Sequence, residues 1–507
     1  MKRFLLLITA LMSFAVASWA HDVEIDGIYY NLDEFNKTAQ VVAIGECSDS
    51  ISIPASILYE SKIYNVTSIG NGAFNSCLNL KLISIGENIR SMGQWVFYDC
   101  DSLTTIVWNP ITYPDTNIAD ESPFYRISKK IETFIFGDKV EYIPQHLCYQ
   151  MTVIKDIIIP NSVTTIAREA FRDCSNLRNV DIGQNVTTIG YHAFSGSALE
   201  NDYSSYDEGL LYIDNCLISA RYCFKNGQLS IKEGTRIISE SAFEDCPNGI
   251  TSVVIPSTVI SIGHGAFYDA NTIQTVIWNA KNHIDSGVVS DIFYEDNITS
   301  IIFGEDVELI PDYLCNRMYN LKSIVWNAKN CSSEAVFNRV KSQIISFSFG
   351  EKVENIPNGL CEGMSKLSYI EIPSSVKSIG DNAFYGCEKV EKVIVHPTSV
   401  PKVSANSFDC YDATLYVLCD IYDDYFNNDV FGKFKVVECI NEEVPTAILE
   451  TFADANITIS EGVISCPDSD FTIYNTIGQN VTAQNGALTP GVYVVQLDND
   501  FVKVMMK

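Results

Sequence analysis

The sequence predicts a β-rich solenoid, in which short coils of backbone stack and their parallel strands form one long sheet. Three observations support this prediction: an aromatic position recurs at nearly constant spacing, an alternating apolar strand recurs with it, and Pro or Gly marks the turns between them. One such coil cannot bury its own apolar side. Neighbouring coils must therefore cover it, as in a stacked array.

The coil at residues 367–387 shows the pattern most clearly. Ile370 and Ile372 have the two-residue spacing of strand side chains that point to the same side. Pro373 ends the strand because it has no N–H to donate to a neighbouring strand. A return leg and a short helical or 3₁₀ turn around Phe384 complete the coil. We predict that this turn places Phe384 in the core.

The Phe384 position recurs through most of the chain, at steps of 22 to 27 residues with one step of 49. Its occupants are Phe74, Phe97, Phe124, Cys148, Phe171, Phe194, Phe243, Phe267, Phe293, Cys315, Phe337, Cys361, Phe384 and Phe408. The long step follows Phe194 and contains two apolar segments, 209–213 and 215–218, which predict a hairpin inserted between coils. Insertions in repeat proteins usually lie on one face.

The N-terminal residues have the features of a secretory signal peptide. Residues 1–20 combine Lys2 and Arg3 with an apolar run and a small-x-small end, and the run is too short to span a bilayer. No other segment predicts a transmembrane span. Residues 21–65 follow as alternating strands that we expect to cap the first open edge of the solenoid.

The remaining boundaries follow from changes in pattern. We assign residues 66–411 to the solenoid, 412–440 to a C-terminal cap and 441–450 to a linker. Residues 451–507 have alternating strands separated by Gly and Pro turns, which predict a small antiparallel, sandwich-like β domain.

The chain carries 63 acidic and 34 basic residues, a formal net charge of −29. Such a surface repels phosphate backbones and anionic lipid, which disfavours nucleic-acid and membrane-surface binding. We expect the acids mainly to keep a long exposed surface soluble.

Eight of the sixteen cysteines occupy repeat positions, which indicates buried core thiols. Cys77 and Cys100 hold the same position on consecutive coils, about 4.8 Å apart, within disulfide reach. Free thiols and a Cys77–Cys100 bridge therefore both stay open, with free thiols favoured.

Two segments resemble known families. Ile69-Gly-Asn-Gly-Ala-Phe-Asn-Ser-Cys77 and Ile379-Gly-Asp-Asn-Ala-Phe-Tyr-Gly-Cys387 resemble the BspA-like leucine-rich repeats of bacterial surface proteins. That resemblance implies a leucine-rich-repeat solenoid and adhesion to host proteins or other cells. The tail from Phe471, with Gly478 and Leu488-x-x-Gly491-Val-Tyr, resembles the C-terminal sorting domain of type IX secretion in Bacteroidetes. It implies a secreted, extracellular protein associated with the outer membrane and the cell surface.

The outward side of the predicted sheet gives the candidate binding residues. Eight of twelve positions in one outward column are apolar, and the column beside it is rich in Ser and Thr. The eight are Val107, Ile135, Ile158, Val254, Ile277, Ile302, Val325 and Ile394. Exposed apolar patches often mark interaction sites, although β-branched residues also simply suit strands. We predict a monomer that binds a protein ligand, such as host extracellular matrix or another cell surface, through this column.

The sequence contains no catalytic or metal-binding motif, so we predict no enzyme activity, no metal and no cofactor. The histidines, from His21 to His396, are scattered and are interpreted as solvated loop residues. Trp108, Trp278 and Trp326 share the inward register and are interpreted as core rather than as sugar platforms. The alternatives are a carbohydrate-binding or carbohydrate-active protein, with acid pairs in the insertion or at 420–429, and a structural surface component.

Overall fold

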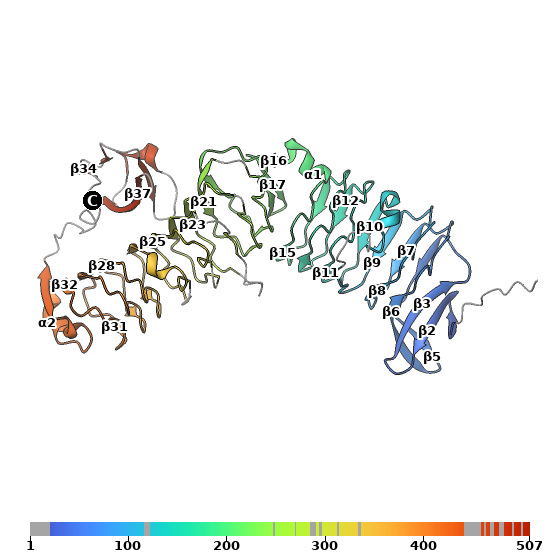
Figure 1. The fold of residues 1–507 in the computed structure, drawn as a ribbon, viewed down its shortest axis with the longest axis horizontal. Helices are drawn as coiled ribbons and strands as arrows, with labels where there is room; N and C mark the ends of the chain where they lie inside the picture. Colours follow the sequence, from blue (N-terminus) through green and yellow to red (C-terminus); the bar gives the residue numbers. More distant parts are fainter. Residues whose placement is uncertain are drawn as a thin grey trace, which may run out of the picture.

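The computed structural model describes residues 21–440 except 116–121, 247–248, 269, 284–290, 294–296, 312–313 and 333–335, together with segments between 458 and 506. The signal-peptide prediction for residues 1–20 and the linker prediction for 441–450 lie outside these residues. The described chain is the predicted parallel-strand solenoid, drawn in Figure 1 as a curved stack of coils from blue to orange.

The main sheet consists of one short strand per coil, paired in parallel without register shifts between most neighbours. Its strands are β4(Ser50–Ser52), β7(Leu82–Ile85), β9(Thr105–Trp108), β10(Thr133–Phe136), β12(Asp156–Ile158), β14(Asn179–Asp181), β19(Gly227–Ser230), β21(Ile250–Ile255), β23(Thr275–Trp278), β24(Ser300–Phe303), β25(Ser323–Trp326), β26(Ser346–Phe349), β28(Tyr369–Ile372), β30(Lys392–Val395), β32(Thr414–Leu418) and β33(Val436–Ile440). The parallel pairing is interrupted between β10 and β12, between β14 and β19, and between β26 and β28. Its first and last strands, β4 and β33, lie beyond the ends of the range 66–411 that the repeat pattern indicates.

The return legs form a second, narrower row of two-residue strands. These are β8(Ser91–Met92), β11(Tyr142–Ile143), β13(Thr165–Ile166), β15(Thr188–Ile189), β20(Ile237–Ile238), β22(Ser261–Ile262), β27(Asn355–Ile356), β29(Ser378–Ile379) and β31(Lys402–Val403). Short 3₁₀ turns connect several elements: η2(Tyr125–Lys130), η3(Tyr203–Ser205), η4(Lys341–Gln343), η5(Cys419–Ile421), η6(Phe431–Lys433) and η8(Thr482–Gln484).

The recurring aromatic position forms one internal column, as predicted. Phe74, Phe97 and Phe124 stack with ring centroids 5.5 Å apart, and Phe171 and Phe194 stack at 5.3 Å. All these rings are at most 2% exposed. Trp108, Trp278 and Trp326 are fully buried, which confirms that they belong to the core.

The core is divided where the insertion interrupts the repeats. One cluster of buried residues runs from Ile28 to Ile237 and a second from Leu210 to Phe434. The insertion itself contains α1(Ala198–Asn201), β16(Tyr206–Asp207), β17(Leu210–Ile213) and β18(Cys216–Ser219). β17 and β18 pair antiparallel, which confirms the predicted hairpin.

Elements outside the repeat pattern flank the stack, and those at the N-terminal end form a mixed sheet. At the N-terminal end these are β1(Val23–Ile25), β2(Ile28–Asp33), β3(Thr38–Ile44), β5(Ser56–Tyr59) and β6(Lys62–Ile69), and beside β32 lies α2(Tyr422–Phe426). The C-terminal part contains β34(Thr458–Ser460), β35(Val463–Ser465), β36(Phe471–Asn475), β37(Gly491–Leu497) and β38(Asp500–Met506), with antiparallel pairing throughout. It has its own small core around Ile473 and Val495.

The disulfides correct one prediction. Cys77 is neither free nor bonded to Cys100, because Cys47, which precedes the repeats, forms a disulfide with it. The Cys100 thiol instead donates to the carbonyl oxygen of Phe74 at 3.0 Å. A second disulfide joins Cys419 and Cys439 near the last strands. The other twelve cysteines are buried and form no disulfide, and those at repeat positions are the core thiols that the pattern predicts.

Candidate functional site on the outward face of the main sheet

The first and third residues of each four-residue strand point away from the core. In β23, for example, Val276 and Trp278 face inward, whereas Thr275 and Ile277 face outward. We call the third-residue positions the outward apolar column and the first-residue positions the outward hydroxyl column. The eight predicted binding residues all lie in the outward apolar column.

The part of the outward face formed by β9, β10 and β12 is open to solvent. Ile135 is 47% exposed, Ile158 is 68% exposed and Val107 is half-buried. Thr133 and Asp156, the hydroxyl-column residues beside them, are exposed as well. The prediction of an accessible apolar stripe therefore holds for this part of the sheet.

The part formed by β21, β23, β24 and β25 differs sharply from this. Ile277 and Ile302 have no exposed surface, Val325 is 5% exposed, and Val254 is half-buried beside them. These residues form a separate apolar cluster rather than joining the main core. The expectation that they are exposed is wrong, and so is the same expectation for Ile394, which is 5% exposed near Glu371 and Tyr416.

The hydroxyl column is buried over the same strands. Thr275 and Ser300 have no exposed surface and Ser252 is 1% exposed, and the hydroxyl oxygens of all three have no hydrogen-bond partner among the described residues. An unpaired buried hydroxyl costs about 1–3 kcal/mol. Another part of the chain must therefore cover these strands without forming hydrogen bonds to their hydroxyl groups.

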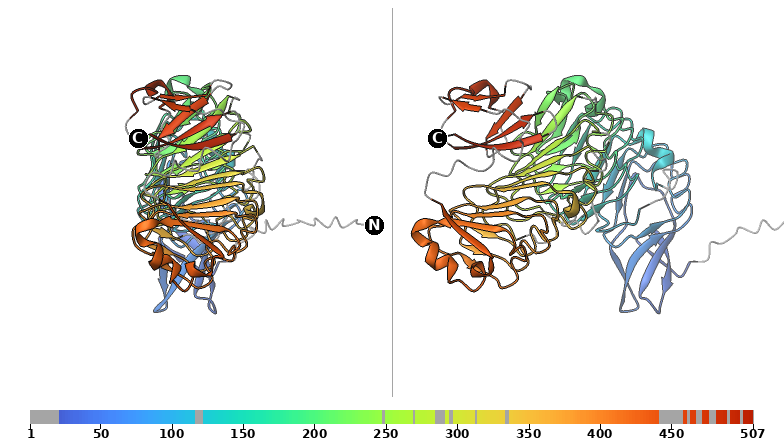
Figure 2. Two further views of the ribbon diagram at one scale, coloured as in Figure 1. Left: turned by 90° about the vertical axis from the view of Figure 1, so that its left-hand side faces the viewer. Right: turned by 60° about the vertical axis from the view of Figure 1, so that its left-hand side comes forward.

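The C-terminal strands lie next to this covered part. In Figure 1 and in the right-hand view of Figure 2 the red strands, which include β37, sit beside β21 to β25 on the side of the main sheet, away from the row of return legs. The open strands β9 to β12 are farther along the stack. The outward face thus has an open part and a covered part.

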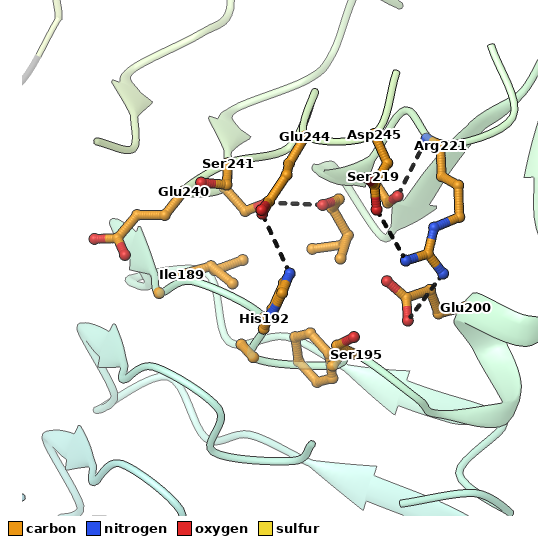
Figure 3. Close-up of a pocket in the computed structure, with 15 residues that line it drawn as sticks. Ile189, His192, Ser195, Glu200, Ser219, Arg221, Glu240, Ser241, Glu244 and Asp245 are labelled. Carbon is orange, nitrogen blue, oxygen red and sulfur yellow. Dashed lines mark hydrogen bonds and ion pairs between the residues drawn. The ribbon is translucent and has the colours of Figure 1, made fainter. Parts of the chain in front are cut away.

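Figure 3 shows a small polar cavity beside the inserted hairpin, where the enzyme alternative would place acid pairs. Its carboxylates are engaged: Glu244 lies 3.2 Å from Nε2 of His192, and Arg221 pairs with Asp245 at 3.4 Å and with Glu200 at 3.9 Å. The cavity measures about 30 Å³, enough for one or two water molecules. It has no room for a sugar ring.

The other acidic candidates are also solvated or paired. Asp420, Asp423, Asp424 and Asp429 are exposed around α2. Among the described residues no group of three His, Cys, Asp or Glu side chains is arranged to hold a metal ion. No helix in the described part of the chain has the length and apolar character needed to cross a bilayer.

The interpretation of the histidines as solvated is wrong at several positions. His146 is 5% exposed and its Nε2 lies 3.1 Å from the carboxylate of Glu169, which Arg168 and Arg172 also contact. Burial works to raise the pKa of Glu169, but Arg168, His146 and Arg172 outweigh it and leave that pKa below its usual value. His283 is buried and accepts a hydrogen bond from the amide of Ile262. The cluster around Glu169 holds neighbouring coils together.

Sequence reasoning missed Trp95. This side chain is 58% exposed and lines a cavity of about 530 Å³ together with Tyr98, Tyr125, Arg126 and Asp115. Its backbone has φ +55°, as is usual at this position of the coil, which is occupied elsewhere by Gly72, Gly265, Gly359, Asn382, His146, Glu169, His192 and Ser241 with similar φ. The signal was present in the sequence: Trp95 stands two positions before Phe97, where most other coils have a polar residue or glycine.

The comparisons with known proteins agree with this fold. No curated protein matches the chain. Solved structures that resemble it include a leucine-rich repeat protein from Bacteroides ovatus ATCC 8483 (19% identity, 83% of this chain, 100% of that chain, TM-score 0.31). A leucine rich cell surface protein from Faecalibacterium prausnitzii A2-165 (18%, 83%, 95%, 0.25) and the pneumococcal vaccine antigen PcpA (13%, 83%, 98%, 0.25) are further examples.

The family comparison is decisive because it covers more than half of the sequence. Six copies of the BspA type leucine rich repeat region match residues 50–153, 218–338 and 333–457. The first match starts at the residue where the parallel main sheet begins. The chain belongs to the BspA-type leucine-rich repeat family.

Proposed function

We propose that this protein is exported and binds a protein partner at the cell surface through the open part of the outward face, with no catalytic role. The single observation that carries this proposal is the exposure of Ile135 and Ile158 at equivalent outward positions on successive coils. Large exposed aliphatic side chains that lie together favour an interaction site. The N-terminal sequence and the C-terminal resemblance to a sorting domain support export.

The charge around these residues indicates the chemistry of the partner. Asp156 and Asp181, from the strands β12 and β14, are exposed on the same face as Ile158. We expect a partner surface with an apolar contact surrounded by Lys or Arg, because complementary charge favours encounter and orientation. Binding should weaken as ionic strength rises, since exposed charges are screened.

A double substitution, Ile135→Lys with Ile158→Lys, tests the proposal. Full-length protein and variant are compared for binding to immobilised host extracellular-matrix proteins by surface plasmon resonance. We expect at least about a tenfold loss of affinity, since truncating or charging one central interface residue commonly costs more than 1 kcal/mol. Leu309→Lys is the matched control, because Leu309 is 43% exposed but lies on the return leg. Equal binding by the double variant and the control would exclude this face.

The cavity at Trp95 favours a second candidate function, carbohydrate binding. Trp95 is 58% exposed at a position where most other coils carry a polar residue or glycine, and an exposed aromatic ring favours contact with a ligand. The flat C–H face of a sugar ring packs on an aromatic ring, and Arg126 and Asp115 supply a donor and an acceptor in the same cavity. The volume of about 530 Å³ is in the range of small-ligand sites.

Intrinsic fluorescence can test this candidate because the other described tryptophans are buried. Neutral oligosaccharides should change the emission of Trp95, and Trp95→Gly should remove binding on a glycan array. Glycine suits the backbone conformation, as Gly72 shows in the preceding coil. Phe224→Ala, at a 70% exposed residue outside the cavity, is the control. Unchanged glycan binding by Trp95→Gly would exclude the cavity.

A further inference from the structure

We infer that the C-terminal sheet of β36, β37 and β38 is an internal ligand of the solenoid, docked on the outward face over β21 to β25. The first support is the pattern of burial along one column of equivalent positions. Ile135 and Ile158 are 47% and 68% exposed, whereas Ile277 and Ile302 are fully buried, although all four point away from the core. A difference this large between equivalent positions requires a cover over the second pair.

The width of the buried region matches a small sheet. Exposure reaches zero on β23 and β24, and it increases at Val254 on one side and at Ser348 on the other. The footprint therefore spans about four strands, roughly 19 Å at the usual strand spacing. The sheet β36–β37–β38 has three strands, about 14 Å across. Figures 1 and 2 place these strands beside β21 to β25.

The chemistry of the footprint indicates that the cover can be displaced. Its apolar column, Ile277, Ile302 and Val325, favours docking by removing aliphatic surface from water. Its hydroxyl column opposes docking, because the hydroxyls of Ser252, Thr275 and Ser300 are buried without partners. A tightly fused domain interface would satisfy such groups. Because apolar burial favours docking and the unpaired hydroxyls oppose it, a competing ligand, or release of the C-terminal sheet, can open the contact between this sheet and the outward face.

Thiol labelling of the full-length chain tests the inference without any knowledge of the external partner. Ser300→Cys places a thiol in the hydroxyl column of the covered part, and Thr133→Cys places one at the equivalent position in the open part. A maleimide reagent is followed by mass spectrometry, with the parent protein as background. That background is low because the twelve free cysteines are buried.

We expect the Ser300→Cys thiol to react at least about tenfold more slowly than the Thr133→Cys thiol, the ratio that corresponds to 1.4 kcal/mol. Val495→Asp, which disrupts the separate core of the C-terminal part, should then raise the Ser300→Cys rate to that of Thr133→Cys and leave the latter unchanged. Equal rates in the parent background would overturn the inference. Protection that persists with Val495→Asp, once circular dichroism and proteolysis show that the C-terminal part is unfolded, would overturn it as well.

Discussion

The internal column of phenylalanines should control the stability of the solenoid one half at a time. Phe171 is fully buried, stacks on Phe194 at 5.3 Å and meets Phe136 edge-on at 6.1 Å. Phe384 repeats this geometry in the second half, with Phe408 at 5.1 Å and Phe349 edge-on at 6.1 Å. The two residues are therefore a matched pair in separate core clusters.

Replacing either residue by alanine leaves a cavity and removes two ring contacts. Large core truncations of this type cost about 3–5 kcal/mol, and aromatic pairs add about 0.5–1.5 kcal/mol, so we expect a loss of roughly 5 kcal/mol. For a unit of about 200 residues this lowers the melting temperature by about 10 °C or more. Because repeat arrays are stabilised by neighbouring coils, each substitution should act on its own half.

Differential scanning calorimetry of the full-length protein measures this effect. Phe171→Ala should lower one unfolding transition and Phe384→Ala another, while Phe224→Ala, at a 70% exposed ring, should change stability by less than about 0.5 kcal/mol. A loss below 1 kcal/mol for Phe171→Ala would refute the column as a stabilising element. One transition that both variants lower equally would refute the division of the core.

Three further predictions concern thiols and charges. Burial raises the pKa of the Cys100 thiol to about 11 and that of the Cys174 thiol to about 12. The stability that these neutral thiols contribute should be complete below about pH 8.5 and should fall as pH rises, by up to about 1.4 kcal/mol per pH unit for each thiol. Cys174→Ala should reduce this slope in thermal melts between pH 8 and 10. Peptide mapping under non-reducing conditions should find Cys47 linked to Cys77, and Cys47→Ser should cost about 3–4 kcal/mol for the 30-residue loop; a Cys77–Cys100 peptide would contradict the structure. The pKa of Glu169 lies below its usual value, so its contribution should be present above about pH 4.5 and be lost as pH falls; Glu169→Gln should lower stability at pH 7 and flatten the acid limb, and an unchanged acid limb would argue against this cluster.

The repeated part of the fold could be predicted from sequence because every coil repeats the same packing problem. The inward strand residues, the phenylalanine column and the buried tryptophans recur at fixed spacing, so periodicity alone identifies them. The hairpin after Phe194 could be recognised because it interrupts that period.

Contacts that do not recur from coil to coil could not be predicted from the period of the repeats. Cys47 lies before the repeats, so no repeat position indicated that it would bond to Cys77. We infer that the burial of Ile277 and Ile302 depends on strands that begin at Phe471, far along the chain and outside the repeat pattern. The side chain of His146 is buried beside the carboxylate of Glu169 on the next coil, which contacts its Nε2. The usual tendency of histidine to be exposed does not reveal such a partner.

Hydroxyl-radical footprinting of the unmodified full-length protein tests most directly the claim that the outward face has an open and a covered part. Ile135, Ile158, Ile277 and Ile302 are the same residue type in the same column, so their oxidation rates can be compared within one sample. The structure predicts rapid oxidation of Ile135 and Ile158 and strong protection of Ile277 and Ile302. Similar oxidation of all four, or protection of Ile135 and Ile158 instead, would contradict the account.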